Sequence, residues 1–126
     1  MIGLAAGPGS MGPHIGFKVT DPFWISISVI PVVSPDFSLL HGGLRLTQDL
    51  AHRDDLSLYL VESVGVTFIT DAWTTLSGGV GVGVRSNPSL LSGISLWGEV
   101  KLSGLSVLGE TFLILPLPSA GVEWYF

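Results

Sequence analysis

The three histidines are the first residues to test for chemistry, because His, Ser and acidic side chains build metal sites and hydrolase triads. His14, His41 and His52 have no metal-ligand spacing with one another or with the acidic residues. His52, close to Asp54 and Asp55, is the nearest approach to a Ser, His and acid site. Such residues in a polar loop usually form a solvated turn. The sequence therefore predicts no metal site, no cofactor and no enzyme.

Two glycine-rich segments superficially resemble phosphate-binding loops, GPGSMG at residues 7–12 and GGVGVG at residues 78–83. Neither is followed by a helical pattern or by the lysine that such a loop requires, so nucleotide binding is not expected. In the second segment Val80, Val82 and Val84 alternate with glycine, which is the period of a β-strand. This strand is apolar on one face and almost empty on the other.

The composition is unusual for a soluble domain. Only 12% of the 126 residues are charged, the net charge is -5, and the mean hydropathy is +0.61. No run of 18 apolar residues predicts a membrane helix. The 5 Lys and Arg residues are too few for nucleic-acid binding. The chain has no cysteine, which excludes a disulfide scaffold, and no secretory signal is recognisable at its start, so an exported protein would be present in mature form.

Alternation of apolar and polar residues recurs along the chain, with turn residues between the runs. The runs predict eight strands: residues 15–20, 23–29, 40–47, 56–69, 75–85, 94–102, 105–115 and 120–126. We therefore expect an all-β fold, an antiparallel up-and-down transmembrane β-barrel of eight strands. Residues 13–126 form the barrel domain, and residues 1–12 are a lead that is disordered, an extra strand or part of a plug.

The charged residues indicate which face of each strand points inward. Seven charged residues fall on the face that carries Gly, Ser and Thr, whereas the aspartates lie in or beside the predicted turns. We expect these seven to form a charge network in the lumen: Lys18, Arg45, Arg85, Lys101, Glu99, Glu110 and Glu123. A soluble barrel would turn this face of small side chains outward. Its exterior would then carry too few charges to keep the protein soluble. The reverse arrangement puts the apolar face in lipid and the charges in a narrow interior, where the glycines leave room for long side chains. Glu62 falls on the apolar face, which predicts a bulge or an interfacial position there.

The last residues, AGVEWYF, carry a family resemblance. Val122, Trp124 and Phe126, with Ala120, form an apolar alternation that ends on phenylalanine. This ending resembles the closing strand of bacterial outer-membrane β-barrels, where it is read by the insertion machinery. The resemblance implies an outer-membrane location and membrane lipid as a partner. It also implies that the longest connections, residues 49–55 and 86–91, lie at the end of the barrel opposite both termini, with shorter ones at Asp21 and residues 116–119.

The sequence thus predicts a small outer-membrane barrel with a plugged polar lumen. Its expected role is structural or accessory, pairing with another envelope protein or with copies of itself. Two other readings stay open: a soluble β-barrel or sandwich that binds a hydrophobic ligand, and a virion or shell subunit whose apolar faces are buried by neighbours.

Overall fold

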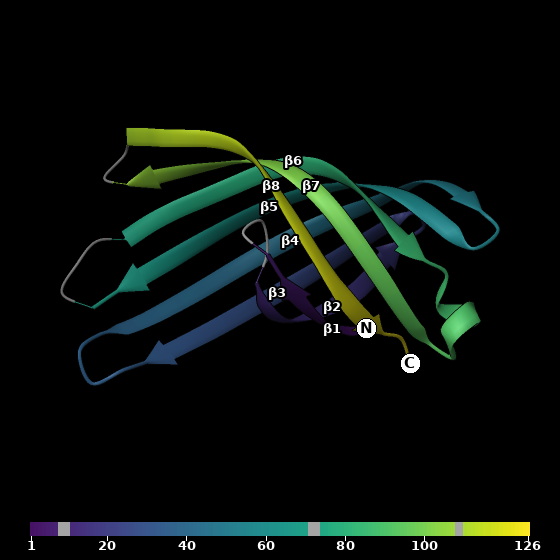
Figure 1. The fold of residues 1–126 in the computed structure, drawn as a ribbon, viewed down its shortest axis with the longest axis horizontal. Coiled ribbons are helices and arrows are strands. Elements are labelled where there is room, and N and C mark those ends of the chain that lie inside the picture. The colour runs from purple at the N-terminus through teal and green to yellow at the C-terminus, as the bar shows by residue number, and fades with distance from the viewer. Residues whose placement is uncertain (8–10, 71–73, 108–109) are drawn as a thin grey trace.

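The computed structural model describes residues 1–7, 11–70, 74–107 and 110–126, except for the side chains of residues 111–113. The chain forms eight strands and one short 3-10 helix: β1 (Ile2–Ala6), β2 (Gly12–Thr20), β3 (Phe23–Val33), β4 (Ser38–Arg53), β5 (Leu56–Ile69), β6 (Thr74–Ser86), η1 (Pro88–Leu91), β7 (Ile94–Val107) and β8 (Glu110–Trp124). Each strand pairs antiparallel with the next, and β1 pairs with β8 to close the barrel (Figure 1). The predicted fold class, an eight-stranded antiparallel up-and-down barrel, is confirmed.

The boundaries of the strands differ from the prediction at both ends of the chain. Ile2–Ala6, within the segment expected to be a lead, forms β1 and pairs with β2 and β8. The expected turn at Ser103 and Gly104 is wrong, because both residues lie inside β7. The expected connection at residues 116–119 is also wrong, because Pro116 and Pro118 lie inside β8. The number of strands is unchanged because one strand is gained at the start, while the last three predicted runs form only two strands, β7 and β8.

This shift reverses the predicted positions of the connections. Counting β1 as the first strand puts both termini at the same end as the connections at Asp21, Asp54 and residues 87–93. The backbone N–H of Tyr125 donates to the carbonyl of Gly93, 2.7 Å away, so the C-terminal residues lie directly against one of these connections. The expectation that the longest connections lie opposite the termini is therefore wrong (Figure 1).

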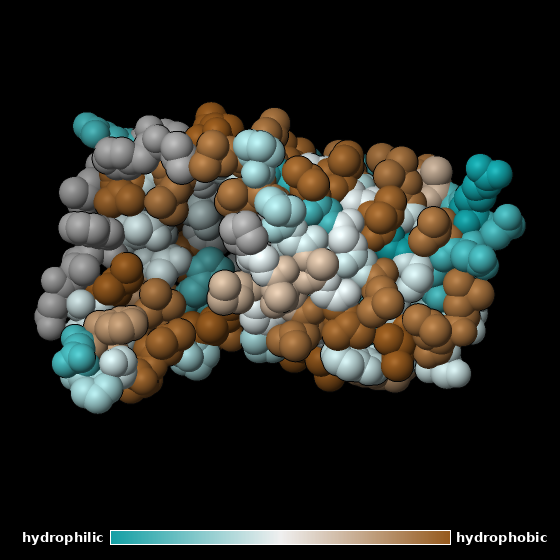
Figure 2. All heavy atoms as spheres, viewed as in Figure 1, coloured by the Kyte–Doolittle hydropathy of each residue, from teal (hydrophilic) through white to brown (hydrophobic). Residues whose placement is uncertain are grey.

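The barrel is polar inside and apolar outside. Large exposed apolar side chains occur on every strand, and the outward series on β6 is Val80, Val82 and Val84. The buried residues are mostly polar, among them Arg85, Glu99 and Lys101. Figure 2 shows apolar side chains over the length of the visible face and hydrophilic ones gathered toward its ends.

Glu62 lies on the outer face, exposed and directly opposite Leu46 on β4 and Val80 on β6. The register shift between β4 and β5 occurs at Asp49 and Ala51, away from Glu62. The bulge expected at Glu62 is therefore not present, and the carboxylate lies among apolar neighbours.

One part of the barrel wall is incomplete among the described residues. β1 and β2 are short, and the hairpin that they form ends midway along the barrel (Figure 1). Beyond it, residues 29–33 of β3 pair only with β4, and residues 110–119 of β8 pair only with β7. We call the space between these two strand segments the side notch. Three prolines, Pro31, Pro116 and Pro118, lie on its edges, where no partner strand requires their missing N–H groups.

Candidate functional site: a polar plug and an apolar chamber

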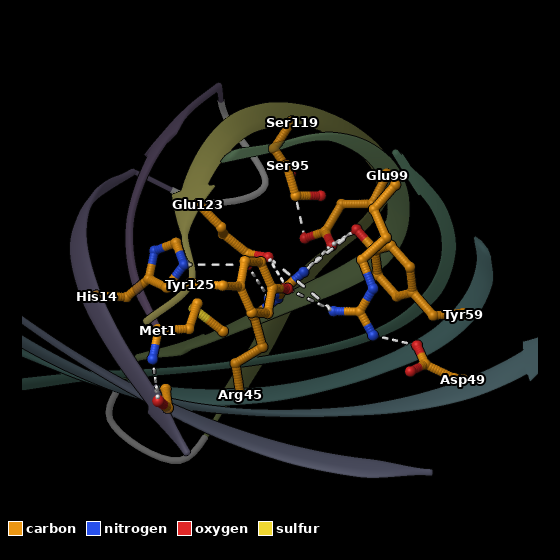
Figure 3. Close-up of polar contacts among 12 residues, drawn as sticks. Met1, His14, Arg45, Asp49, Tyr59, Ser95, Glu99, Ser119, Glu123 and Tyr125 are labelled. Atoms are coloured by element: carbon orange, nitrogen blue, oxygen red, sulfur yellow. Dashed lines mark hydrogen bonds and ion pairs between the residues drawn. The ribbon is translucent and has the colours of Figure 1, made fainter. Parts of the chain in front are cut away.

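A cluster of charged and aromatic side chains crosses the barrel in the half nearest the termini (Figure 3). We call this cluster the plug. Its members share the inward-facing phase of their strands: His14, Arg45, Asp49, Tyr59, Arg85, Trp97, Glu99, Lys101, Ser119 and Glu123. Tyr125, just beyond β8, closes it at the end of the barrel.

The centre of the plug is the carboxylate of Glu99 on β7, whose side chain is fully buried. Its Oε2 accepts hydrogen bonds from Arg45 Nη2 at 2.6 Å and from the Tyr59 hydroxyl at 2.9 Å. Its Oε1 accepts one from Ser119 Oγ at 3.3 Å and lies 3.6 Å from Lys101 Nζ. Both oxygens are satisfied, as a buried carboxylate requires. Glu99 therefore links four strands, since Arg45, Tyr59 and Ser119 lie on β4, β5 and β8.

A second carboxylate, Glu123 on β8, extends the network across the β8–β1–β2 seam. His14 Nε2 lies 3.3 Å from its Oε1, and Arg45 Nη1 lies 3.7 Å from the same oxygen. The Tyr125 hydroxyl donates to its Oε2 at 2.8 Å. Burial, aided by the Glu123 carboxylate, raises the pKa of the Tyr125 phenol, which therefore stays protonated as a donor.

The two arginines of the plug are also held by aromatic rings. Arg45 lies over the ring of Trp97, 4.9 Å from its centroid, and over that of Tyr59 at 5.6 Å. Arg85 forms an ion pair with Asp49 and lies 5.1 Å from the Tyr59 centroid. Ring faces attract cations, and the attraction is stronger when water is excluded. The plug therefore balances buried cations with both carboxylates and rings.

Glycines make the space for these rings. A Cβ at Gly83 on β6 would overlap the ring of Tyr59, and one at Gly121 would overlap the indole of Trp97. A Cβ at Gly3 would overlap the imidazole of His14 in the same way. The empty face of the GGVGVG strand thus accommodates Tyr59 at its Gly83 position.

The structure brings together five of the seven residues expected in the lumen: Arg45, Arg85, Lys101, Glu99 and Glu123. Lys18 lies at the end of β2, is 46% exposed, and pairs with Asp21 outside the plug. Glu110 is exposed at the first position of β8, at the other end of the barrel. Neither residue lies in the plug, because the Lys18 ammonium is directed to the exposed Asp21 and Glu110 lies at the opposite end of the barrel.

The plug also contains residues that the sequence interpretation did not select. Asp49 was assigned to a loop, but β4 continues to Arg53 and turns Asp49 inward onto Arg85. Trp97 lies two residues before Glu99 on β7, and Tyr59 has the inward-facing phase of β5. A period of two therefore assigns both residues to the polar face. That alternation was the available signal for both residues.

The remaining candidates lie apart from the plug. His52 Nδ1 lies 2.7 Å from Ser57 Oγ, and no ion pair joins His52 to Asp54 or Asp55 among the described residues. Of the expected insertion signal, Val122 and Trp124 lie in β8, and Phe126 follows the strand and is 93% exposed. The described part of the chain holds no group of three or more His, Cys, Asp or Glu residues placed to bind a metal ion.

Above the plug, in the half of the barrel away from the termini, lies a cavity of about 630 Å³ that we call the chamber. Its floor consists of plug residues, among them His14, Arg45, Trp97 and Lys101. Small polar residues such as Ser63 and Ser77 form its middle. Its upper wall is apolar: Ile30, Val32, Leu39, Leu105, Leu115 and Leu117.

Within the described residues, no helix has the length and apolar character needed to cross a membrane. Comparisons with protein-family models, with curated proteins and with solved structures find no match for this chain.

Proposed function

We propose that this chain is a small β-barrel of the bacterial outer membrane, with a lumen closed by the plug and no catalytic activity. Its role is structural or accessory: it spans the lipid and pairs with another envelope protein or with copies of itself. The observation that carries the proposal is the inverted distribution of polarity, with charges enclosed and apolar side chains exposed on every strand.

The outer surface supports a lipid environment. Contiguous apolar patches on soluble monomers rarely exceed a few hundred Å². Here outward residues such as Phe17, Leu44, Leu58, Val82 and Leu96 are each between two fifths and two thirds exposed, on five different strands. Strands of 9 residues or more, as in β2 to β8, also have the length that tilted strands need to cross a hydrocarbon core. β1, with 5 residues, is too short to do so alone.

The interior supports a closed rather than a conducting barrel. Eight strands leave an interior just wide enough to be filled by side chains. The plug fills one half of it with paired ions, and its members interact across the axis rather than lining a channel (Figure 3). A route for water or ions along the axis would have to break the contacts of Glu99 and Glu123.

The test is the environment that the chain requires to fold. Urea-unfolded protein is diluted into phosphatidylcholine vesicles, into detergent, and into buffer alone, and folding is followed by heat-dependent gel mobility and sedimentation. We expect a folded, heat-sensitive barrel that floats with the vesicles, and aggregation in buffer alone.

Two outcomes would contradict the proposal. A monodisperse folded protein in buffer would indicate a soluble carrier of hydrophobic ligands. Large uniform particles in buffer would indicate a shell subunit whose apolar faces are covered by neighbouring copies. Fractionation of bacterial cells expressing the chain behind a signal peptide checks the location, with the outer-membrane fraction expected.

A further inference from the structure

The chamber has a polar floor and an apolar upper wall that the described residues leave partly uncovered. Val32, Leu105 and Leu115 border the cavity, yet they are 40%, 41% and 42% exposed. Burying such surface is favourable by roughly 25 cal/mol per Å². A volume of about 630 Å³ falls in the range of roughly 300–1,000 Å³ that small-molecule sites occupy. The chamber therefore has the size and the wall of a binding site for an apolar group.

The floor carries buried groups that lack hydrogen-bond partners. Among the described residues three such atoms remain, Ser26 Oγ, Arg45 Nε and Trp97 Nε1, and all three residues border the chamber. Each of these groups can donate a hydrogen bond, and two of them can only donate. Leaving a buried donor unsatisfied costs about 1–3 kcal/mol. The three atoms have almost no accessible surface, so an acceptor in the chamber is stabilised by them once the floor side chains turn toward it. Arg45 is already paired with Glu99, but the described residues that line the chamber include Arg45 and Lys101 and no acidic residue, so the lining favours an acceptor that is negatively charged.

Among the described residues, the side notch connects the chamber with the outside of the barrel wall. Gly7 and Gly12, at the end of the β1–β2 hairpin, border the cavity, as do Val32 on one edge of the notch and Leu117 on the other. In Figure 2 the surface is hollowed beside this hairpin. An elongated ligand can therefore have one end at the floor and the other between the edges of the wall.

We infer that the chamber binds a single-chain amphiphile with an anionic head, of the class of long-chain fatty acids. The carboxylate lies at the floor, near Arg45, Ser26 and Trp97, and the alkyl chain covers the apolar wall and extends toward the side notch.

The orientation can be measured with Trp97 as a reporter, because bromine quenches tryptophan fluorescence only at short range. A variant with Trp24→Phe, Trp73→Phe and Trp124→Phe retains Trp97 alone and is refolded into vesicles of unbrominated phosphatidylcholine. It is titrated with 2-bromohexadecanoate, which carries bromine beside the carboxylate, and with 16-bromohexadecanoate, which carries it at the tail. We expect saturable loss of Trp97 fluorescence with the first acid and a smaller loss with the second.

Two neighbouring residues on β7 provide a matched pair of controls. Ser103→Phe adds a ring inside the chamber, and Leu102→Phe adds it on the outer face. Quenching of Trp97 should be lost in the first variant and retained in the second. Native mass spectrometry of the unaltered chain should show one added fatty acid, a measurement that does not depend on any substitution folding correctly.

Several results would overturn the inference. These are unsaturable or absent quenching by both acids, equal quenching in Ser103→Phe, or no bound acid in the mass spectrum. Stronger quenching by the 16-bromo acid would show that the tail and not the carboxylate lies near Trp97, which contradicts the proposed orientation. Quenching of Trp97 by brominated phosphatidylcholine alone would indicate that the chamber takes up a lipid chain through the notch and not a fatty acid. The titration can also be run in buffer, so it remains informative if the barrel proves to be soluble.

Discussion

At the scale of single residues, Glu99 binds together parts of the chain that are distant in sequence. Its partners Arg45, Tyr59 and Ser119 belong to three other strands, so this carboxylate connects the strands inside the barrel, where few of the described apolar side chains are fully buried. An intact buried ion pair contributes little to stability, but removal of one partner leaves the other charge unpaired in a poorly solvated site. The plug should therefore be sensitive to loss of any one of its charges.

Glu99→Gln tests this sensitivity with almost no change of shape. We expect the free energy of unfolding to fall by about 3–5 kcal/mol, because Arg45 and Lys101 lose their common counter-ion. The measurement is urea unfolding in vesicles, followed by tryptophan fluorescence. The matched control is Glu110→Gln, an exposed carboxylate at the rim, which should stay within about 0.5 kcal/mol of the parent. Equal midpoints for the two variants would contradict a stabilising role of Glu99.

Gly83→Ala tests whether glycine on the inner face of β6 is required by the plug. The added methyl group would overlap the ring of Tyr59, which is 1% exposed and held by Glu99 and Arg45. We expect destabilisation of about 1–3 kcal/mol, as for other overpacked sites. Gly42→Ala is the control, since a Cβ at Gly42 meets nothing within 4 Å. That variant should unfold like the parent or be slightly more stable, because alanine restricts the unfolded chain.

Glu62 provides a residue-scale test of the outer face. It lies between Leu46 and Val80, where a carboxylate in contact with hydrocarbon is unfavourable. Glu62→Leu should raise the free energy of unfolding in vesicles and leave the fold unchanged. A lower stability of this variant would indicate that Glu62 has a polar partner in the membrane.

At the scale of strands, the tolerance of the outer face of β6 for charge should depend on the position along the strand. Val82 is outward-facing and midway along the strand, so Val82→Arg should cost about 2–4 kcal/mol in a bilayer. Ser86 continues the same face at the end of the strand, where the charge of Ser86→Arg should cost only about 0–1 kcal/mol. Loss of the hydrogen bond that Ser86 Oγ accepts from the Leu96 N–H adds about 1 kcal/mol to that cost. Unfolding of both variants in vesicles checks the difference. Similar costs at the two positions would mean that this face does not contact a hydrocarbon core.

The residues after β8 allow insertion in cells to be separated from folding. Phe126 is 93% exposed and lies outside the barrel, so its replacement should not affect refolding in detergent. Under the outer-membrane resemblance, Phe126→Ser should lower the amount of inserted protein in cells, measured by fractionation and heat-dependent gel mobility. Unchanged insertion would remove the resemblance as a support for the proposed location.

Alternation was sufficient to predict the fold class and the faces of most strands, because a period of two assigns each residue to one side of a sheet. It also placed Arg45 and Glu99 inside. Alternation did not predict the strand around Pro116 and Pro118. Prolines usually indicate a turn, and they are tolerated here because this edge of β8 has no partner strand among the described residues, which the sequence does not reveal. It could not select Asp49 or exclude Lys18, because both depend on where a strand ends rather than on its phase.

At the scale of the whole molecule, the plug and the barrel wall together predict that the barrel does not conduct ions. Purified protein reconstituted in a planar bilayer should give little or no steady current, because paired ions and rings occupy the axis. A wide porin in the same bilayer serves as the control for insertion. A stable large conductance would show that the plug opens or that several chains share a wider barrel.

The prolines at the side notch have a consequence for assembly. An unpaired strand edge presents a row of N–H and C=O groups that can recruit a strand from another chain, which is a route to hybrid barrels and aggregates. Pro31, Pro116 and Pro118 cannot donate to such an added strand. The unpaired edges in the described part of the chain are therefore poor templates for a neighbouring chain, and copies of this barrel should associate through their outer faces rather than by exchanging strands.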